Sequence, residues 1–377
     1  MKEYDILIVG AGIAGASLAW RLAGQRSVAL LERESQPGYH STGRSAAMFM
    51  ESYGPPMVRA LTRASRAFYE QPPEGFAPDL MQPRGVIYLA THGQEKELAH
   101  TRTELSPSCT GLATLDAGTT LAHVPCLRPD LVHGALYDAG AQDLDVHALH
   151  QGFLRGFRRK AGADGEVRTS AGVTRATHDG RCWTVELADG RTLRARTVVN
   201  AAGAWADELG AVFGARPIGL VPHRRSAFTF KGPEGVDASH WPAVVGVDES
   251  YYFKPDAGQL LGSPANADAT VPHDVVPEEL DIAMGIHQIE SVSTLTIRRP
   301  ASTWAGLRSF VPDGEMVIGN DGECPGFFWL AAQGGYGIQS AAGASALADA
   351  LIRQAALPEE LARQGVDASR LSPARLR

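Results

Sequence analysis

The chain has 377 residues, of which 44% are hydrophobic and 20% charged, and its formal net charge is −7. A chain longer than about 250–300 residues usually divides its core, so we expect two domains. The net negative charge leaves no electrostatic footprint for nucleic acid or for an anionic membrane surface. The basic residues between Arg155 and Lys160 follow a helical spacing, and we expect them on the solvent-exposed face of a helix.

Cysteine and histidine spacing argues against disulfides and metals. The four cysteines, Cys109, Cys126, Cys182 and Cys324, are far apart and form no CxxC or Cys/His pattern. The 12 histidines include no HxH or HExxH pattern. We therefore predict no disulfide framework, no metal site, and a reducing, cytoplasmic compartment.

The N-terminal apolar run predicts a strand rather than a targeting or membrane segment. Glu3 and Asp5 precede it, regularly spaced glycines interrupt it, and it is shorter than the roughly 18 apolar residues of a membrane span. We expect no transmembrane segment. Residues 6–9 are typical of a strand buried on both faces, residues 16–23 of a helix, and residues 28–32 of a second strand.

Glycines join the first strand to the helix in the sequence Gly10-Ala-Gly12-Ile-Ala-Gly15. Gly10 makes a tight turn, Gly12 lets backbone amides approach a pyrophosphate, and Gly15 lets helix and strand pack closely. The helix N-terminus favours the anion, and Glu32 would accept hydrogen bonds from ribose hydroxyls. Together these features predict dinucleotide binding; the alternative is a glycine-rich turn with no ligand.

Three further stretches favour FAD over NAD. Thr42-Gly43-Arg44-Ser45 predicts a second helix N-terminus, whose hydroxyl and cation suit the phosphates and flavin edge of an extended FAD. Residues 197–205 indicate a buried strand that ends in small residues, as a chain passing close to a cofactor requires. Residues 334–339 precede an expected helix, 340–354, whose amides would face the flavin pyrimidine.

A family resemblance rests on Glu32 and on the motifs GAGIAG, GYHSTGRSAA, VVNAAGAWAD, GLRSFVPDGEMVIG and AAQGGYGIQ. These features resemble the FAD-dependent glycine/D-amino-acid oxidase family, and most closely its D-arginine dehydrogenase branch. The resemblance runs nearly end to end. It implies an α/β fold in which a Rossmann-like FAD-binding domain is joined to a second, sheet-rich substrate-binding domain.

The expected domains are discontinuous, because FAD-type segments lie at both ends and in the middle of the chain. We assign residues 1–85, 146–212 and 306–377 to the FAD-binding domain, and residues 86–145 and 213–305 to the substrate domain. Alternating strands with Asp-Gly turns predict a β-meander over residues 167–200. The polar tail, 357–377, is expected to be partly loose.

The motifs and the resemblance assign a set of positions to FAD: Gly10, Gly12, Ile13, Ala14, Gly15, Glu32, Arg33, Thr42, Gly43, Arg44, Ser45, Ala46, Ala202, Gly203, Trp205, Gly306, Arg308, Gly334, Gly335, Tyr336, Gly337, Ile338 and Gln339. Many sarcosine-type relatives attach flavin through a cysteine near the position of Arg308. The segment here has no cysteine. We therefore expect non-covalent FAD.

The resemblance also implies the residues that bind the substrate. Arg308 and Arg225 match positions that grip a carboxylate, and Tyr53 and Tyr252 match tyrosines that line the pocket. From residue type alone, an interface ion pair for the arginines and core packing for the tyrosines are the alternatives. Two further matches, Gly335 and Gln339, would approach the substrate amine or the flavin. The expected pocket wall is Met48, Met50, Ala243 and Val245.

The chain departs from the D-arginine pattern in its expected pocket. The carboxylate that pairs with a cationic side chain is missing after Arg84, and thioethers adapt to varied apolar shapes. This favours neutral side chains. Glu51 is the candidate replacement carboxylate, but its place next to Met50 should turn it away from the pocket.

The sequence therefore predicts a D-amino-acid dehydrogenase or oxidase that yields an imino acid, which hydrolyses to a 2-oxo acid and ammonia. A secondary-amine oxidase of the sarcosine or glycine type is the second hypothesis. A flavin-binding module without a substrate is the third, and it leaves the paired arginines unexplained. Either dioxygen or a quinone would act as electron acceptor.

Overall fold

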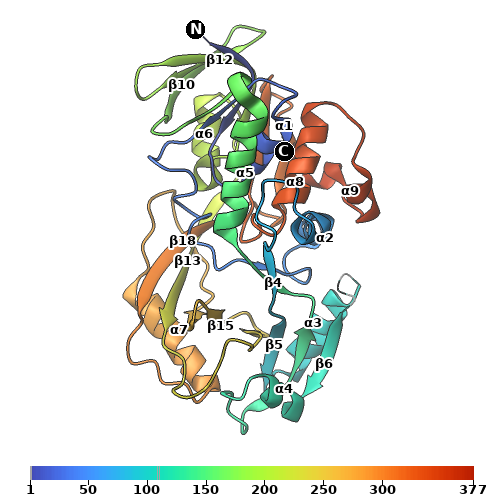
Figure 1. The fold of residues 1–377 in the computed structure, drawn as a ribbon, viewed down its shortest axis with the longest axis vertical. Helices are drawn as coiled ribbons and strands as arrows, with labels where there is room; N and C mark the ends of the chain where they lie inside the picture. Colours follow the sequence, from blue (N-terminus) through green and yellow to red (C-terminus); the bar gives the residue numbers. More distant parts are fainter. Residues whose placement is uncertain (1, 108, 110) are drawn as a thin grey trace.

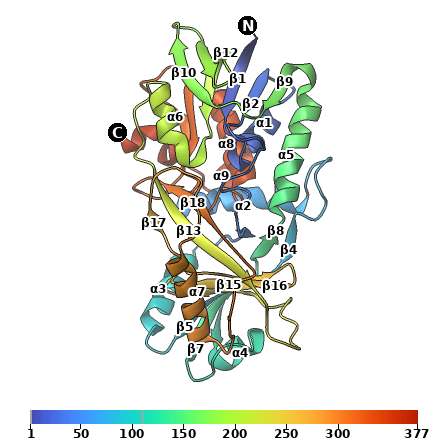
Figure 2. The same ribbon diagram turned by 90° about the vertical axis from the view of Figure 1, so that its left-hand side faces the viewer.

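The computed structural model describes residues 2–107, 109 and 111–377, which form two lobes, each built on one large sheet (Figure 1). The chain passes between the lobes several times, and the long strands β13 (Val221–Phe230) and β18 (Ser302–Phe310) lead from one lobe into the other (Figure 2). No helix in the described part of the chain is long and apolar enough to cross a membrane.

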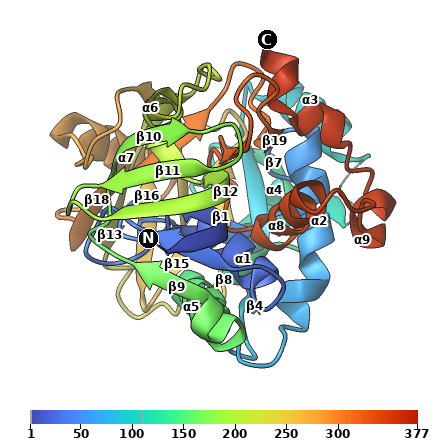
Figure 3. The ribbon, with the colours of Figure 1, turned by 90° about the horizontal axis from the view of Figure 1, so that it is seen from above.

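The first sheet holds the N-terminal strand at its centre (Figure 3). Its strands are, in spatial order, β10 (Val173–His178), β11 (Trp183–Leu187), β12 (Thr192–Asn200), β1 (Glu3–Val9), β2 (Val28–Leu31) and β9 (Gly165–Arg168), while β20 (Phe327–Ala331) pairs with β12, and β19 (Val317–Asn320) with β20. The pairs β1–β12, β1–β2, β2–β9 and β12–β20 are parallel. This is the doubly wound arrangement typical of a nucleotide-binding domain.

Apolar side chains cover both faces of this sheet. Ile6 and Ile8 pack with one group of helices, and Leu7 packs on the opposite face. The first group is α1 (Ile13–Leu22), α2 (Pro56–Glu70), α5 (Val146–Ala161) and α8 (Ala341–Ile352). On the opposite face, side chains of the sheet, those of its β10–β11–β12 meander included, pack with α6 (Ala206–Val212) and with the segment 213–220 that follows it. The continuous apolar run of β1 follows from this burial on both sides.

The second sheet combines three separate parts of the sequence. Its path is β17 (Asp268–Ala269), β13, β16 (Gln259–Ser263), β15 (Tyr252–Asp256), β14 (Ala243–Gly246), β5 (Val86–Thr91), β7 (Val132–Asp138) and β6 (Leu112–Asp116), with β18 pairing with β13. Phe228, Val244 and Phe253 point to one face, where they pack with Ile289 of α7 (Glu279–Val292). Alternate residues on these strands therefore point to the other face, toward the first lobe.

Smaller elements join the lobes and surround the second sheet. A three-stranded sheet links β3 (Met48–Phe49), β8 (Gln142–Leu144) and β4 (Met81–Pro83). The helices α3 (Glu95–Leu105) and α4 (Ala117–His123) lie beside β5, β6 and β7. α9 (Glu359–Arg363) and the 3₁₀ turns Gly162–Asp164, Gly203–Trp205, Ala368–Leu371 and Pro373–Leu376 complete the fold.

Most sequence expectations about local structure are confirmed. The strand, glycine turn, helix and second strand follow in the predicted order, and the meander has its turns at the two Asp-Gly pairs. All four cysteines are free and buried. The basic residues Arg155, Arg158, Arg159 and Lys160 are exposed on α5.

Two expectations were wrong. Residues 45–50 do not start a helix, because Met48 and Phe49 pair with β8 and the preceding residues 39–44 form turns. The tail is not loose either: Leu371 is buried, Arg375 pairs with Asp313, and Arg377 pairs with Asp321. The tail is polar in composition, but its charges meet fixed partners on the first lobe.

The strand β18 lies across one of the expected domain boundaries. β18 pairs with β13 along its whole length, from Ser302 to Phe310. The expected boundary between residues 305 and 306 cuts through this strand. The division into an FAD domain and a substrate domain stays a proposal.

Candidate active site

A cavity lies between the two lobes. The face of the second sheet that points away from α7 forms one side, and the loops at the carboxyl ends of the first sheet form the other. Its walls include most of the positions assigned to FAD: Gly12, Ile13, Ala14, Thr42, Arg44, Ser45, Ala46, Gly203, Gly306, Arg308, Gly334, Gly335, Gly337, Ile338 and Gln339. They also include Arg225, Tyr53 and Tyr252, and the four expected pocket residues Met48, Met50, Ala243 and Val245. The fold thus brings together residues from both ends and the middle of the chain.

Two of the expected glycines, Gly10 and Gly15, allow close contacts between backbone segments around the nucleotide loop. Gly10 has a φ of +106°, and a Cβ on it would lie 2.3 Å from the carbonyl oxygen of Ala201. A Cβ on Gly15 would lie 1.9 Å from the carbonyl oxygen of Gly10. Neither glycine lines the cavity. Their lack of a side chain instead lets β1, α1 and the end of β12 pack closely against each other.

The N-terminus of α1 fits an anion. No side chain caps the first residue of the helix through a conventional N-cap bond, and Gly12, Ile13 and Ala14 line the cavity. The Ile13 N–H donates to Thr42 Oγ1 at 3.0 Å, which ties the glycine loop to the 39–44 turn. The other amides of the first turn have no acceptor within the helix, and these are the groups that bind a pyrophosphate in nucleotide-binding folds.

Glu32 directly follows β2 and lies next to the glycine loop. Its side chain accepts hydrogen bonds from the Ala11 N–H at 3.1 Å and the Glu34 N–H at 3.0 Å. Burial raises the pKa of Glu32, while these two donors favour its charged form. The carboxylate is therefore fixed in orientation, although it does not line the cavity.

Three other expected FAD residues, Arg33, Ala202 and Trp205, do not line the cavity. Arg33 lies over the ring of Trp205, 4.6 Å from its centroid, and His40 lies 4.6 Å from the same ring. Ala202 precedes the Gly203 turn, which has a φ of +58°. These residues form the outer edge of the nucleotide end of the site.

Arg44 lines the cavity, but its guanidinium is already engaged. It forms an ion pair with Asp274 and donates to the carbonyl oxygens of Val275 at 2.9 Å and Ala305 at 3.2 Å. Gly43 donates to the Gly38 carbonyl at 2.8 Å and does not itself line the cavity. The expected phosphate-side cation therefore anchors the 39–44 turn to the second lobe.

The arginine pair arises from strand register. In the β13–β18 ribbon, Arg225 is opposite Gly306 and His223 is opposite Arg308. Opposed residues and residues two apart share a face, so both guanidinium groups point to the cavity side. Gly306 leaves the space opposite Arg225 open.

The two guanidinium groups have few protein partners. Arg225 Nε donates to the Asn266 carbonyl at 2.6 Å, and Arg308 Nη2 donates to the Tyr53 hydroxyl. Neither arginine forms an ion pair with any residue that the structure describes. Burial and the nearby charge of Arg308 lower the pKa of Arg225, although a guanidinium stays protonated under any physiological condition.

Aromatic rings hold Arg308 in place. Its guanidinium carbon lies 5.3 Å from the ring centroid of Phe310 and 5.9 Å from those of Tyr53 and Tyr336. Tyr336 itself does not line the cavity; it packs edge-on against Tyr53 with centroids 4.9 Å apart. This support limits the rotamers open to Arg308 and orients its free nitrogens.

Gly335 lies against Arg308, whereas Gln339 makes hydrogen bonds within the protein. A Cβ on Gly335 would lie 2.4 Å from Arg308 Nε and Nη2, so the guanidinium rests directly against the glycine. The Gln339 side chain is used within the protein: it donates to Thr62 Oγ1 at 3.0 Å and accepts from the Met50 N–H at 3.3 Å. Its side chain therefore holds the 50–53 loop, and only part of it borders the cavity.

One row of side chains crosses the second sheet beneath the cavity. Val245 is opposite Tyr88 on one side and opposite Tyr252 on the other. Ala243 and Lys254 lie two residues along the same strands, so they share that face. These residues form a wall that is apolar at Ala243 and Val245 and polar at its ends.

Sequence reasoning missed several polar residues that line the cavity, among them Tyr88, Lys254 and Glu249. Tyr88 donates to Ser52 Oγ at 2.8 Å, because the Ser52 hydroxyl donates its one proton to Asp138 at 2.9 Å. The buried Lys254 forms an ion pair with the half-buried Asp143 at 2.7 Å. Glu249, exposed on the β14–β15 turn with a φ of +56°, also lines the cavity. The period of two from Tyr252 would have found Lys254, while the turn residue Glu249 carries no such signal.

Glu51, the expected alternative carboxylate, points elsewhere. Its side chain pairs with Arg66 Nε at 2.6 Å, and Arg66 also contacts Glu70 at 3.1 Å. Glu51 is not among the residues that line the cavity. The expectation that it faces away from the pocket is confirmed.

The fold and the site together define a two-lobed dinucleotide-binding protein with a cavity beside its glycine loop. The family described as FAD dependent oxidoreductase (DAO) matches residues 5–350, and the chain belongs to this family. FAD is therefore its cofactor, and an oxidoreductase of this kind acts on a small-molecule substrate and passes electrons to an acceptor.

Individual relatives agree with this assignment. Glycine oxidase from Geobacillus kaustophilus is 26% identical over 341 residues, 86% of each chain. The crystal structure of glycine oxidase from Geobacillus kaustophilus has a TM-score of 0.84 at 23% identity, covering 100% of this chain and 99% of that one, and it supports the fold. Human mitochondrial dimethylglycine dehydrogenase is 27% identical over 265 residues, 69% of this chain and 30% of that protein, so the chain spans less than a third of this relative.

Proposed function

We propose that the protein oxidises the C–N bond of an amino acid, and that its preferred substrates are D-amino acids with neutral side chains. The observation that carries this proposal is the pair Arg225 and Arg308. Two guanidinium groups on one face of a ribbon, without a carboxylate partner among the residues described, favour an anion between them. A substrate carboxylate is such an anion.

The residues around the pair would orient the substrate. Arg308 has free nitrogens toward the cavity, and Tyr53 and Tyr252 border the same space, so a carboxylate held there has both charged and hydroxyl donors. The chemistry that bound FAD supplies is acceptance of a hydride from the carbon that carries the amine. The imino acid then hydrolyses in water to a 2-oxo acid and ammonia.

The amine must be neutral when the hydride leaves, because its lone pair stabilises the developing positive charge. We assign no side chain as general base. Lys254 is engaged with Asp143, and Glu249 lies exposed on a turn. We therefore infer that solvent takes the amine proton.

The wall of the cavity supports a neutral side-chain preference. Met48, Met50, Ala243 and Val245 offer adaptable apolar contacts. A buried guanidinium without a counter-charge costs several kcal/mol, so a cationic side chain would bind poorly against this wall. Glu249 is the lining residue that would supply such a counter-charge.

The test compares kcat/KM for D-arginine with that for D-methionine, D-leucine and D-phenylalanine. We expect the neutral substrates to lead. If D-arginine leads by about ten-fold or more, the neutral-pocket proposal fails. Glu249→Gln then identifies the source: loss of the D-arginine preference in this variant would assign the counter-charge to Glu249.

A glycine- or secondary-amine oxidase is the second candidate. The observation that favours it is the similarity to proteins called glycine oxidase and dimethylglycine dehydrogenase. An anaerobic screen of flavin bleaching separates the two: D-amino acids should bleach the flavin faster than glycine, sarcosine or L-amino acids. Faster bleaching by sarcosine or glycine would assign the second function, and no bleaching by any amine would favour the module without a substrate.

We further propose that FAD is bound without a covalent link. Each of the cysteines is described by the structure, and none lines the cavity. Acid precipitation should therefore release the yellow colour into the supernatant. Colour retained in the washed pellet would contradict this proposal. The same holoenzyme, assayed with dioxygen and with a soluble quinone, would identify the electron acceptor.

A further inference from the structure

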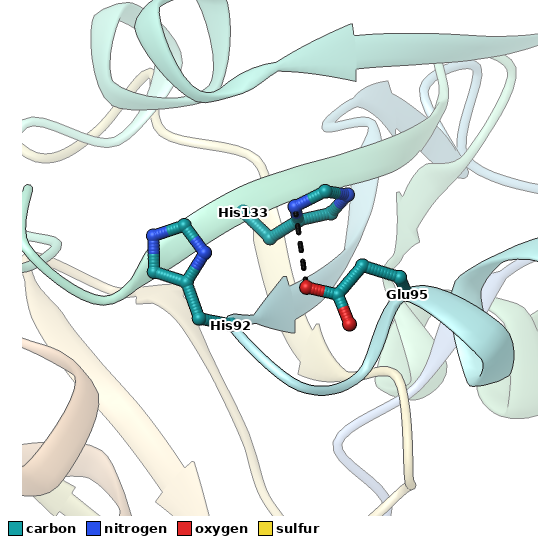
Figure 4. A group of neighbouring side chains, drawn as sticks. All are labelled: His92, Glu95 and His133. Carbon is teal, nitrogen blue, oxygen red and sulfur yellow. Dashed lines mark ion pairs between the residues drawn. The ribbon is translucent and has the colours of Figure 1, made fainter.

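Three exposed side chains come together at the far end of the second lobe, away from the cavity walls. They are His92, Glu95 and His133 (Figure 4). One nitrogen or oxygen ligand atom from each lies within 4.8 Å of those from the other two. His133 Nδ1 is 3.6 Å from Glu95 Oε1, and the two imidazole rings have centroids 6.0 Å apart.

A β-bulge produces this cluster. β5 and β7 pair in register up to Ala90 and Gly134, and the next pair is Thr91 with Val132. His133 is therefore the extra residue of the bulge, and bulges commonly re-aim a side chain. His92 continues β5 into the turn, where its N–H donates to the Leu131 carbonyl at 3.0 Å.

The carboxylate of Glu95 is fixed beside the two imidazoles. Its Oε1 accepts from the Gly93 N–H at 3.0 Å, so the side chain folds back from the first residue of α3 toward the turn. This backbone donor, together with the nearby histidines, lowers the pKa of Glu95. The second oxygen remains available to a ligand.

We propose that His92, Glu95 and His133 form a binding site for a divalent cation of the zinc type. Two imidazoles and a carboxylate are a common three-ligand set for Zn²⁺, with water as the fourth ligand. Three atoms no more than 4.8 Å apart have a common point within about 2.8 Å of each. Zinc bonds are about 2.0–2.2 Å long, so sub-ångström movements of exposed side chains complete the geometry.

The spacing of these residues explains why the sequence gives no sign of the site. His92 and Glu95 are close in the chain, but His133 comes from a neighbouring strand and meets them through the bulge. The positive end of the α3 dipole opposes a cation here, and all three residues are exposed. The site should therefore bind more weakly than a buried structural zinc centre.

The experiment titrates ZnCl₂ into the FAD-loaded protein by isothermal calorimetry and follows the melting temperature in parallel. We expect one zinc ion per chain and a higher melting temperature, because the metal binds only the folded arrangement. His92→Asn/His133→Asn should weaken this binding by at least about ten-fold and abolish the thermal shift. The matched control is His100→Asn. His100 is exposed and lies on α3, the helix that carries Glu95, so this variant should bind zinc as the unaltered protein does.

Circular dichroism and FAD content, compared in the absence of zinc, will show that the variants are folded. The proposal is overturned if the unaltered protein binds no zinc, or if the double variant keeps the same affinity and stoichiometry. A response in which His100→Asn weakens binding as much as the double variant would also overturn it. None of these outcomes depends on which amine the protein oxidises.

Discussion

Gly335→Ala offers a direct test of the arginine arrangement. Gly335 is not among the glycines with positive φ, so alanine introduces no backbone strain. Its Cβ would lie 2.4 Å from Arg308 Nε and Nη2 and 2.7 Å from the guanidinium carbon, where ordinary contact begins at 3.4 Å. The guanidinium must therefore move by about 1 Å, and its movement is limited by the rings of Tyr53, Phe310 and Tyr336.

A displacement of about 1 Å in a substrate-positioning group costs about 100-fold, or roughly 2.7 kcal/mol of transition-state stabilisation. We expect kcat/KM for the best D-amino acid to fall by about this factor while the FAD content, measured by absorbance, stays unchanged. Gly322→Ala is the matched control, because a Cβ there meets nothing within 4 Å and its φ is not positive. If Gly335→Ala keeps kcat/KM within about three-fold of the control, Arg308 does not hold the substrate where we infer.

Three further predictions concern the substrate carboxylate, the substrate amine and the C-terminal tail. Arg308→Met should remove a charge-assisted contact worth roughly 1.5–3 kcal/mol and reduce kcat/KM accordingly with FAD retained; an unchanged kcat/KM in a flavin-replete variant would contradict the carboxylate role. Because we propose that solvent takes the amine proton, kcat/KM should rise with pH between about pH 6 and 10 to a plateau, as the protonated substrate amine becomes neutral; a flat profile would be inconsistent with this reasoning. Arg377→Gln should lower the free energy of unfolding by about 1–3 kcal/mol, because Asp321 is buried beneath Arg377 and Trp329. Although burial opposes ionisation, the hydrogen bonds from Arg377 and Trp329 lower the pKa of Asp321. This contribution is therefore present above the ordinary carboxyl pKa and is lost as the pH falls through the lowered value, so thermal melts of the two proteins should converge in acid; an equal difference at all pH values would refute it.

The nucleotide half of the fold could be predicted because its signals are local. The glycine spacing, the apolar strand and the terminal Glu32 each act within a few residues, and all of them occur in the structure as expected. The helix expected after Ser45 was wrong for a non-local reason. Small residues there permit a helix, but pairing of Met48 with Asp143 on β8 decides the conformation.

The part of the site on the second sheet could be predicted only at positions that match the family motifs or follow the two-residue period of a strand. Arg225 and Arg308 meet because two distant strands pair in one register, which no local pattern reveals. Glu249 lies on a turn and Lys254 follows Tyr252 by two residues, so only the second has a periodic signal. The tail was misjudged because its polar composition says nothing of the partners that its arginines find on the first lobe.

The cavity draws on residues as far apart as Gly12 and Gln339, and this has a consequence for biosynthesis. At about 5–20 residues per second, a ribosome needs on the order of half a minute to make the chain between them. During that time β1, α1 and β2 are complete, but the sheet lacks β20, and the cofactor lacks the wall that precedes α8. We therefore expect the nascent chain to hold an open nucleotide loop that binds FAD weakly. We expect flavin capture to be a late event that coincides with closure of the first sheet, so that cofactor supply acts on the last stage of maturation rather than on early folding.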